Sequence, residues 1–346
     1  MLRFLSLASI VGALLGAAVA HAATPYKIVT ASERGTYIQI GRDLAKYVAP
    51  AAGIDLEVLP SAGSSENVQR LRYEPGVKFA LVQSDVYQAY ITQGEAGNAE
   101  AARMIRPLRV VLPLYNEEIY FIVRADAPYN DVHDIRDARI NVGLLRSGTA
   151  MSATTLYRLM FNQPLADAKM SFLSNEEALA KLVTDKSVDV VVIVAGQPAK
   201  VITDMKPEAR ALIKLLKFDP KHPASQAALK TYFPSTVLKE NYPNLLTEDL
   251  AGIAVKAFLV TYDYNLSSTQ GNLARFARSL CQNFEILQSQ GHPKWKEVAL
   301  AMPDLGRGWS YYGPIAQELK RCTAPQARPQ PAKACPTEQK ILGLCE

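Results

Sequence analysis

Short apolar runs alternate with amphipathic stretches along the first part of the chain. Between the first two runs, Tyr37, Ile40 and Leu44 recur at steps of three and four residues, which places them on one face of a predicted helix. The second run leads through "PSAGSSENVQRL" into another predicted helix. A strand–helix–strand–helix–strand order predicts a parallel sheet with helices on its faces. The apolar runs lie at residues 26–29, 56–59 and 79–82.

The same pattern restarts after a long apolar stretch. "LRVVLPLYNEEIYFIVRAD" contains two apolar runs that meet at residues 116–118, and it predicts long strands that connect one lobe to another. Beyond it, "RINVG" predicts a strand, "LLRSGTAMSATTLYRLM" a turn and a helix, and "VDVVVIVAG" a buried strand. We place the return crossing near "LIKLLKFDP" and expect a helical part from about residue 247 to residue 300. The predicted fold class is therefore α/β, with two lobes around a cleft, joined by hinge strands.

The N-terminus predicts export from the cytoplasm. Met1-Leu2-Arg3 is a short basic start, residues 4–19 are mostly apolar, and Ala20-His21-Ala22 has the form of a cleavage site. The apolar run is short for a membrane span, so we expect a secreted, periplasmic mature chain. The predicted segments are a signal peptide (1–22), the first part of lobe 1 (23–120), lobe 2 (121–218), a helical part that returns to lobe 1 (219–318) and a Cys- and Pro-rich tail (319–346).

Charge and cysteine content narrow the classes of partner. The formal net charge is +5, and removal of Arg3 with the signal peptide lowers it by one, to +4. No dense Lys/Arg run is present, so we expect no nucleic-acid partner. An even number of cysteines in an oxidising compartment predicts disulfides, and we favour Cys281–Cys322 and Cys335–Cys345 among the three possible pairings. The alternative, a metal site, lacks a C-x-x-C pair and a neighbouring His, so we expect no metal.

Several predicted strands end in loops of one composition, rich in Gly, Ser and Thr. The carboxyl ends of parallel strands share one edge of a sheet, where ligands collect. Helix N-termini there offer free N–H groups and partial positive charge to an anion. Ordinary N-capping explains any one of these loops, but their recurrence in two successive units favours a cleft. The loops are 32–37, 61–67, 83–85, 146–149 and 195–198.

The ordered set of these loops resembles one family of binding proteins. "GTY", "SAGSSENVQRL", "FALVQSD", "SGT" and "VDVVVIVAGQPA", behind a signal peptide, are similar to the TAXI family, the extracytoplasmic solute receptors of TRAP-type transporters, over residues 26–300. The resemblance implies a type II periplasmic binding-protein fold and a small carboxylate or amino acid, glutamate-like, as the ligand. The ligand would pass to the subunits of a membrane permease.

Carried over position by position, the resemblance also implies a set of ligand-binding residues, contributed by both lobes. They are Ser32, Gly35, Thr36, Tyr37, Ser61, Gly63, Ser64, Asn67, Gln83, Ser84, Asp85, Ser147, Gly148, Thr149, Gly196, Gln197 and Pro198.

Individual side chains have alternative roles. Arg146 could bind a ligand carboxylate, although we favour a solvated loop charge. Asp85 could accept a ligand ammonium or cap the helix that it starts. Tyr37 and Tyr115 are hypothetical pocket walls, and Tyr37 is also suited to the buried helix face.

We expect no catalytic residue and no cofactor, because the three histidines of the mature chain, at positions 133, 222 and 292, lie outside the loops. Two alternatives remain open: an enzyme on the same two-lobe fold that processes a small cofactor precursor, and a binding protein that reports to a sensor kinase.

Overall fold

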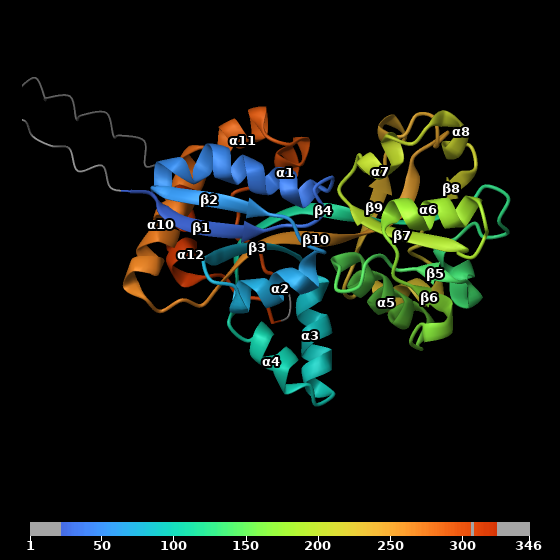
Figure 1. Ribbon diagram of the computed structural model, residues 1–346, viewed down its shortest axis with the longest axis horizontal. Coiled ribbons are helices and arrows are strands. Elements are labelled where there is room, and N and C mark those ends of the chain that lie inside the picture. The colour runs from blue at the N-terminus through green and yellow to red at the C-terminus, as the bar shows by residue number, and fades with distance from the viewer. Residues whose placement is uncertain (1–21, 306–307, 324–346) are drawn as a thin grey trace, which may run out of the picture.

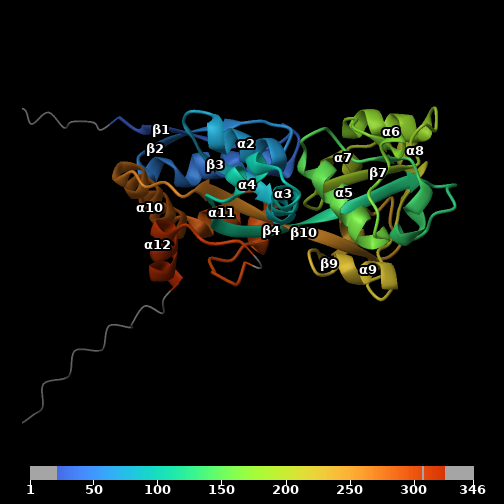
Figure 2. The ribbon, with the colours of Figure 1, turned by 90° about the horizontal axis from the view of Figure 1, so that it is seen from below.

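The computed structural model describes residues 22–305 and 308–323 and contains two α/β lobes. The predicted signal peptide, Cys335 and Cys345 lie outside these residues. Figures 1 and 2 show the first lobe and the second lobe side by side, with two long strands running from one to the other. Within the described ranges, no helix is both long and apolar enough to cross a membrane.

The first lobe is built from three parallel strands and the helices that connect them. Tyr37, Ile40 and Leu44 are buried in its core, as the helical periodicity predicts. Its N-terminal elements are β1 (Thr24–Val29), α1 (Thr36–Asp43), the helical turns η1 (Leu44–Val48) and η2 (Pro50–Ala52), β2 (Ile54–Leu59), α2 (Ser64–Tyr73), β3 (Val77–Gln83), α3 (Asp85–Glu95) and α4 (Ala99–Ile105).

A single strand, β4 (Leu108–Arg124), carries the chain into the second lobe. Its two ends pack in different cores: Val111 lies in a core cluster of the first lobe and Phe121 in one of the second. The second lobe contains η3 (Val132–Asp137), β5 (Ile140–Asn141), α5 (Gly148–Phe161), η4 (Asp167–Lys169), β6 (Met170–Ser171), α6 (Asn175–Val183), β7 (Val190–Ala195), α7 (Lys200–Thr203), α8 (Pro207–Arg210), β8 (Ile213–Leu215), α9 (Pro223–Ala228), β9 (Phe233–Val237) and η5 (Lys239–Asn241).

The chain returns along β10 (Leu250–Tyr262), and the predicted place of this crossing was wrong. The predicted segment near 212–220 forms only the short strand β8, which pairs with β4 inside the second lobe. Residues 219–249 also stay with the second lobe, where Tyr232 is part of the core (Figure 2). The β10 sequence "LAGIAVKAFLVTY" is almost uniformly apolar because both faces of the strand are buried over most of its length. Such a run cannot be told from a buried helix by periodicity.

The crossing strands run antiparallel and define the hinge. Val255 is opposite Glu117 and Lys256 is opposite Asn116. One continuous sheet results, in the order β2-β1-β3-β10-β4-β7-β5-β6, with β9 on β10 and β8 on β4. The two lobes, their helices on both faces and the paired crossing strands confirm the predicted fold class.

Helices at the C-terminal end cover the first lobe. They are α10 (Ser267–Gln282), α11 (Phe284–Gln290), the turn η6 (Pro293–Glu297) and α12 (Gly313–Thr323). A disulfide joins Cys281 to Cys322, so it ties α12 to α10, and this is one of the two favoured pairings. Residues 292–294, at the start of η6, lie next to β4, where Lys294 donates a hydrogen bond to the Asn116 carbonyl. The sequence pattern did not predict this placement.

Candidate functional site: the cleft between the lobes

A cleft of about 830 Å³ lies between the two lobes. The first lobe contributes the loop before α1, the start of α2 and the end of β3. The second lobe contributes the start of α5, the end of β7 and parts of α6, α7 and α8. A volume of this size is typical of pockets for small molecules.

Most of the ligand-binding residues that the resemblance implies line the cleft. Every predicted strand-end loop contributes at least one residue to its lining. The predicted residues that line it are Ser32, Gly35, Thr36, Tyr37, Gly63, Ser64, Gln83, Ser147, Gly148, Thr149 and Pro198, and those that do not are Ser61, Asn67, Ser84, Asp85, Gly196 and Gln197.

The first-lobe side presents two helix starts without side-chain caps. Neither Gly35 before α1 nor Gly63 before α2 supplies a side-chain cap. In the first turn of α2, the Glu66 N–H instead donates to the Arg146 carbonyl of the second lobe at 3.2 Å. Beside them, the Ser64 hydroxyl donates to Gln83 Oε1 at 3.2 Å and accepts the Gln83 N–H at 3.1 Å. Both helix starts line the cleft, and the partial positive charge at a helix N-terminus is suited to an anionic group.

The second-lobe side differs, because ordinary capping explains part of its loop. Ser147 Oγ accepts the N–H of Ala150 at 2.9 Å, so this Ser is the N-cap of α5. Gly148 follows, and a Cβ there would lie 1.9 Å from Gln83 Oε1 of the first lobe. A Cβ on Gly63, whose φ is +128°, would lie 3.0 Å from the Gly148 nitrogen. The two lobes therefore approach each other closely at these two glycines, where a side chain would hold them apart.

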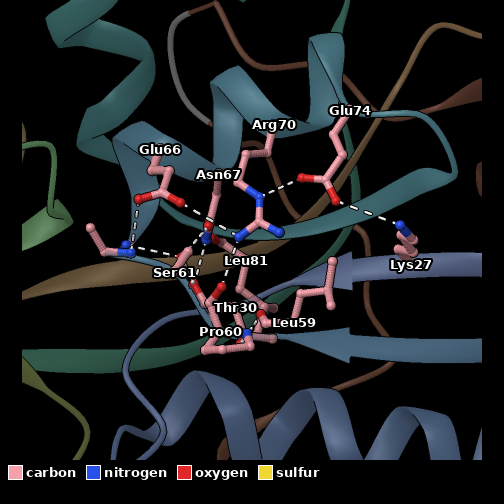
Figure 3. Close-up of polar contacts among 12 residues, drawn as sticks. Lys27, Thr30, Leu59, Pro60, Ser61, Glu66, Asn67, Arg70, Glu74 and Leu81 are labelled. Atoms are coloured by element: carbon pink, nitrogen blue, oxygen red, sulfur yellow. Dashed lines mark hydrogen bonds and ion pairs between the residues drawn. The ribbon is translucent and has the colours of Figure 1, made fainter.

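Ser61 and Asn67 hold the first lobe together instead of facing the cleft (Figure 3). Asn67 donates to the carbonyl of Leu81 at 2.7 Å and to that of Thr30, and the Ser61 hydroxyl donates to Asn67 Oδ1 at 2.6 Å. Nearby, Glu66 accepts the Ala62 N–H and pairs with Arg70, so its role is local. These side chains tie the loop before α2 to the ends of β1 and β3.

Asp85 joins the lobes outside the cleft. Its Oδ2 accepts from the Ser152 hydroxyl at 2.6 Å and from the Tyr232 hydroxyl at 2.8 Å, and both donors belong to the second lobe. Burial raises the pKa of Asp85, while these two hydrogen bonds act in the opposite direction. The neighbouring Ser84 is absent from the lining, and its backbone N–H donates to the Lys256 carbonyl in the hinge.

The corner after β7 is also structural except at Pro198. Gln197 donates its backbone N–H to Glu118 Oε2 and its side-chain amide to Glu118 Oε1, each at 3.0 Å. Its Oε1 accepts the Leu238 N–H, which ties the corner to η5. A Cβ on Gly196 would lie 2.8 Å from the Lys294 side chain, so Gly196 packs against the hinge. Of the other two residues considered from sequence, Arg146 is an exposed loop residue, as favoured, and Tyr115 is fully buried outside the cleft lining.

Glu117 is the principal lining residue that the sequence prediction missed. It lies on β4 in the hinge, is 4% exposed, and its Oε2 has no hydrogen-bond partner among the described residues. Burial, the largest cause, raises its pKa to about 8, and the nearby Tyr37 hydroxyl partly opposes the rise. The Tyr37 hydroxyl is also buried and, like Glu117 Oε2, has no hydrogen-bond partner of normal geometry among the described residues, so the hydrogen bond between them that lowers the pKa of Glu117 is a weak one. These two polar groups in the cleft are therefore incompletely satisfied within the described part of the chain.

Other missed residues lie at the hinge and at the cleft mouth. His292 lines the cleft, and burial lowers its pKa, which favours the neutral imidazole. Its neighbour Lys294 is buried outside the lining and pairs with Glu297 at 2.8 Å. At the mouth, Arg34 of the first lobe lies 3.5 Å from Glu176 of the second, and both are well exposed. Such an exposed pair contributes little to stability.

The chain belongs to the NMT1-like family, whose model matches residues 28–290. Three solved structures with low sequence similarity illustrate the likeness. A protein of Xanthomonas citri, XAC2383, bound to chloride, is 13% identical with a TM-score of 0.47, covering 86% of this chain and 98% of its own.

The names of the other two proteins describe components of transporters. The binding protein component of an ABC phosphonate transporter of Pseudomonas aeruginosa is 12% identical, with a TM-score of 0.43 and coverage of 73% of this chain and 72% of its own. A putative periplasmic sulfonate-binding protein, SsuA of Methylobacillus flagellatus, is 11% identical, with a TM-score of 0.46 and coverage of 87% and 85%.

Proposed function

We propose that this protein is a periplasmic solute receptor of a TRAP-type transporter, which binds a small carboxylate or amino acid and delivers it to a membrane permease. The observation that carries the proposal is the cleft itself: two uncapped helix starts of one lobe face the glycine-containing start of α5 in the other. A ligand carboxylate would accept hydrogen bonds from the N–H groups of α1 and α2. Closure around it would proceed by bending at the paired hinge strands.

The ligand-binding residues that we propose are the cleft-lining ones. Thr36 and Ser64 are hydroxyl donors at the two helix starts, and Tyr37 is both core and wall. Gly63 and Gly148 allow the lobes to meet over the ligand. No side chain in this set has the form of an activated nucleophile, so we propose binding without catalysis.

A thermal-shift screen of amino acids, dicarboxylates and keto acids, followed by calorimetry on the hits, tests the proposal. A ligand that binds only the folded chain raises its melting temperature by mass action. The proposal predicts a saturable rise with at least one glutamate-like compound. If no compound of these classes shifts the melting temperature or releases heat, the ligand assignment is wrong.

An enzyme on the same fold is a second candidate, because His292 and Glu117 both line the cleft. A neutral imidazole and a carboxyl group with a raised pKa are suited to proton transfer. Mass spectrometry after incubation of each binding compound with the protein separates the two functions. A receptor returns the compound unchanged, whereas an enzyme yields a product.

A further inference from the structure

The carboxyl group of Glu117 is the feature of the cleft that the proposed function does not yet use. It projects from the hinge strand β4, where Val255 of β10 is its neighbour across the sheet. A carboxylate buried to this extent without a partner is costly, and such groups in native structures generally have a counter-charge, a metal or a ligand. Glu117 Oε2 has no hydrogen-bond partner of normal geometry among the described residues, and the nearby Tyr37 hydroxyl and Lys294 only partly lower the raised pKa of the group.

Lys294, the cation whose charge lowers the pKa of Glu117, already has other partners. Lys294 Nζ lies 2.8 Å from Glu297 Oε1 and 3.7 Å from Glu118 Oε2, and it donates to the Asn116 carbonyl at 3.2 Å. Lys294 is therefore paired with other groups, and its charge only partly opposes the raised pKa of Glu117. The charged and titratable groups that act on Glu117 come from α1, β4, α3 and η6, and they are Tyr37, Tyr115, Glu118, Tyr120, Asp85 and Lys294.

We propose that Glu117 binds an ammonium group of the ligand, so that the site selects amine-bearing compounds and exchanges a carboxyl proton for the bound cation. This inference rests on the proposed function, because it concerns the same cleft. In this arrangement, two groups of the ligand bind at different ends of the site. A carboxylate takes the uncapped starts of α1 and α2, and the ammonium lies at the hinge between Glu117 and the Tyr37 hydroxyl.

Proton release follows from the state of the empty site. With its pKa raised to about 8, Glu117 is mostly protonated at neutral pH. An ammonium next to it favours the ionised form and lowers the pKa. On binding, the O–H bond of the carboxyl group breaks, the proton passes to solvent, and the carboxylate pairs with the intact ammonium. A ligand without an amine leaves that proton in place.

Calorimetry with L-glutamate and glutarate tests the inference on the wild-type chain, because the two probes differ only in the amine. Titrations at pH 7 in two buffers of different ionisation enthalpy give the number of protons released. We expect close to one proton for L-glutamate and none for glutarate, with L-glutamate the tighter ligand by roughly 30-fold or more. Equal affinity and no proton release for both would overturn the amine assignment but leave the receptor proposal standing.

Substitution provides an independent measurement. Glu117→Gln keeps the shape of the side chain and is expected to weaken L-glutamate by roughly 30-fold while changing glutarate by less than about threefold. Glu33→Gln removes the same charge from an exposed position beside the cleft, and it should change neither. Equal weakening of both probes would show a structural role for Glu117 and contradict the inference. Failure of wild-type protein to bind either probe would contradict the glutamate-like receptor proposal and the amine assignment together.

Discussion

Glu117 and Glu118 are adjacent on β4, yet they face different surroundings. Glu118 lies on the protein-filled side of the hinge, where Gln197 donates two hydrogen bonds to it and Lys294 is 3.7 Å away. Glu117 lies on the cleft side with an unpartnered oxygen. Burial raises the pKa of both carboxyl groups. The protein thus satisfies one carboxyl group with its own residues, and we propose that its neighbour binds a molecule from outside.

The largest expected effect concerns pH and Glu117. Its folded pKa of about 8, against an ordinary value of 4.5, means that the folded chain holds an extra proton between these values. The stability linked to that proton is fully present below about pH 4.5 and is lost as the pH rises through 8. Relative to the wild type, the free energy of unfolding of Glu117→Gln should therefore rise by roughly 3 to 5 kcal/mol from pH 4.5 to pH 9.

Urea unfolding of both proteins across this pH range measures the difference. Glu33→Gln is the control, because an exposed carboxyl group should give a nearly constant offset from the wild type. A constant offset for Glu117→Gln as well would mean that Glu117 titrates normally in the folded chain.

The second prediction concerns Glu118. Glu118→Ala leaves the Gln197 N–H and side-chain amide without their acceptors and removes one partner of Lys294. Breaking a buried pair in this way is expected to lower the free energy of unfolding by about 3 kcal/mol. Urea unfolding at pH 7 measures the loss, and the preference for L-glutamate over glutarate should survive. Loss of that preference without loss of stability would reverse the roles of the two carboxyl groups.

The third prediction concerns the contact between the lobes. Gly148→Ala places a Cβ against Gln83 Oε1 and Ser64 Oγ, so the lobes cannot approach as closely as they do here. We expect ligand affinity to fall roughly 10-fold, about 1.4 kcal/mol, with the stability of each lobe retained. Gly271→Ala, in an open position on α10, is the matched control and should leave affinity unchanged. Unchanged affinity in Gly148→Ala would show that closure does not require this contact.

The smallest expected effect distinguishes the Thr36 hydroxyl, which lines the cleft, from the Asn67 side-chain amide, which stabilises the fold. Thr36→Ala removes one donor at the start of α1 and should weaken the ligand by about 1 kcal/mol, roughly fivefold, with little change in folding. Asn67→Ala should lower the free energy of unfolding instead, since Asn67 bonds to the carbonyls of Thr30 and Leu81. Calorimetry and urea unfolding on both variants check the contrast, and the same loss in both measurements for Thr36→Ala would contradict it.

The sequence pattern predicts the lobes well because alternating strands and amphipathic helices record which face is buried. It misplaces the return crossing because β10 is apolar on both faces. The site is harder to predict because a polar side chain at a strand end can serve the cleft or the protein. The side chains of Asn67, Asp85 and Gln197 could hydrogen-bond to a ligand, but in the structure they form hydrogen bonds with other residues of the protein.

The sequence contains a pattern that could have identified Glu117 as a candidate site residue. Two consecutive glutamates interrupt an apolar run that otherwise reads as a buried strand, and a carboxyl group on such a strand needs a partner. The sequence alone could not tell which of the two would be satisfied internally. That depends on Gln197 and Lys294, which lie far away along the chain and meet the hinge only after folding.

The most direct test is a ¹³C NMR titration of the Glu117 carboxyl group with and without L-glutamate. We expect a pKa near 8 for this carboxyl group in the empty site and a clear decrease in the complex, because the ligand ammonium stabilises the carboxylate. A pKa near 4.5 in the ligand-free protein, or one that saturating L-glutamate leaves unchanged, would contradict it.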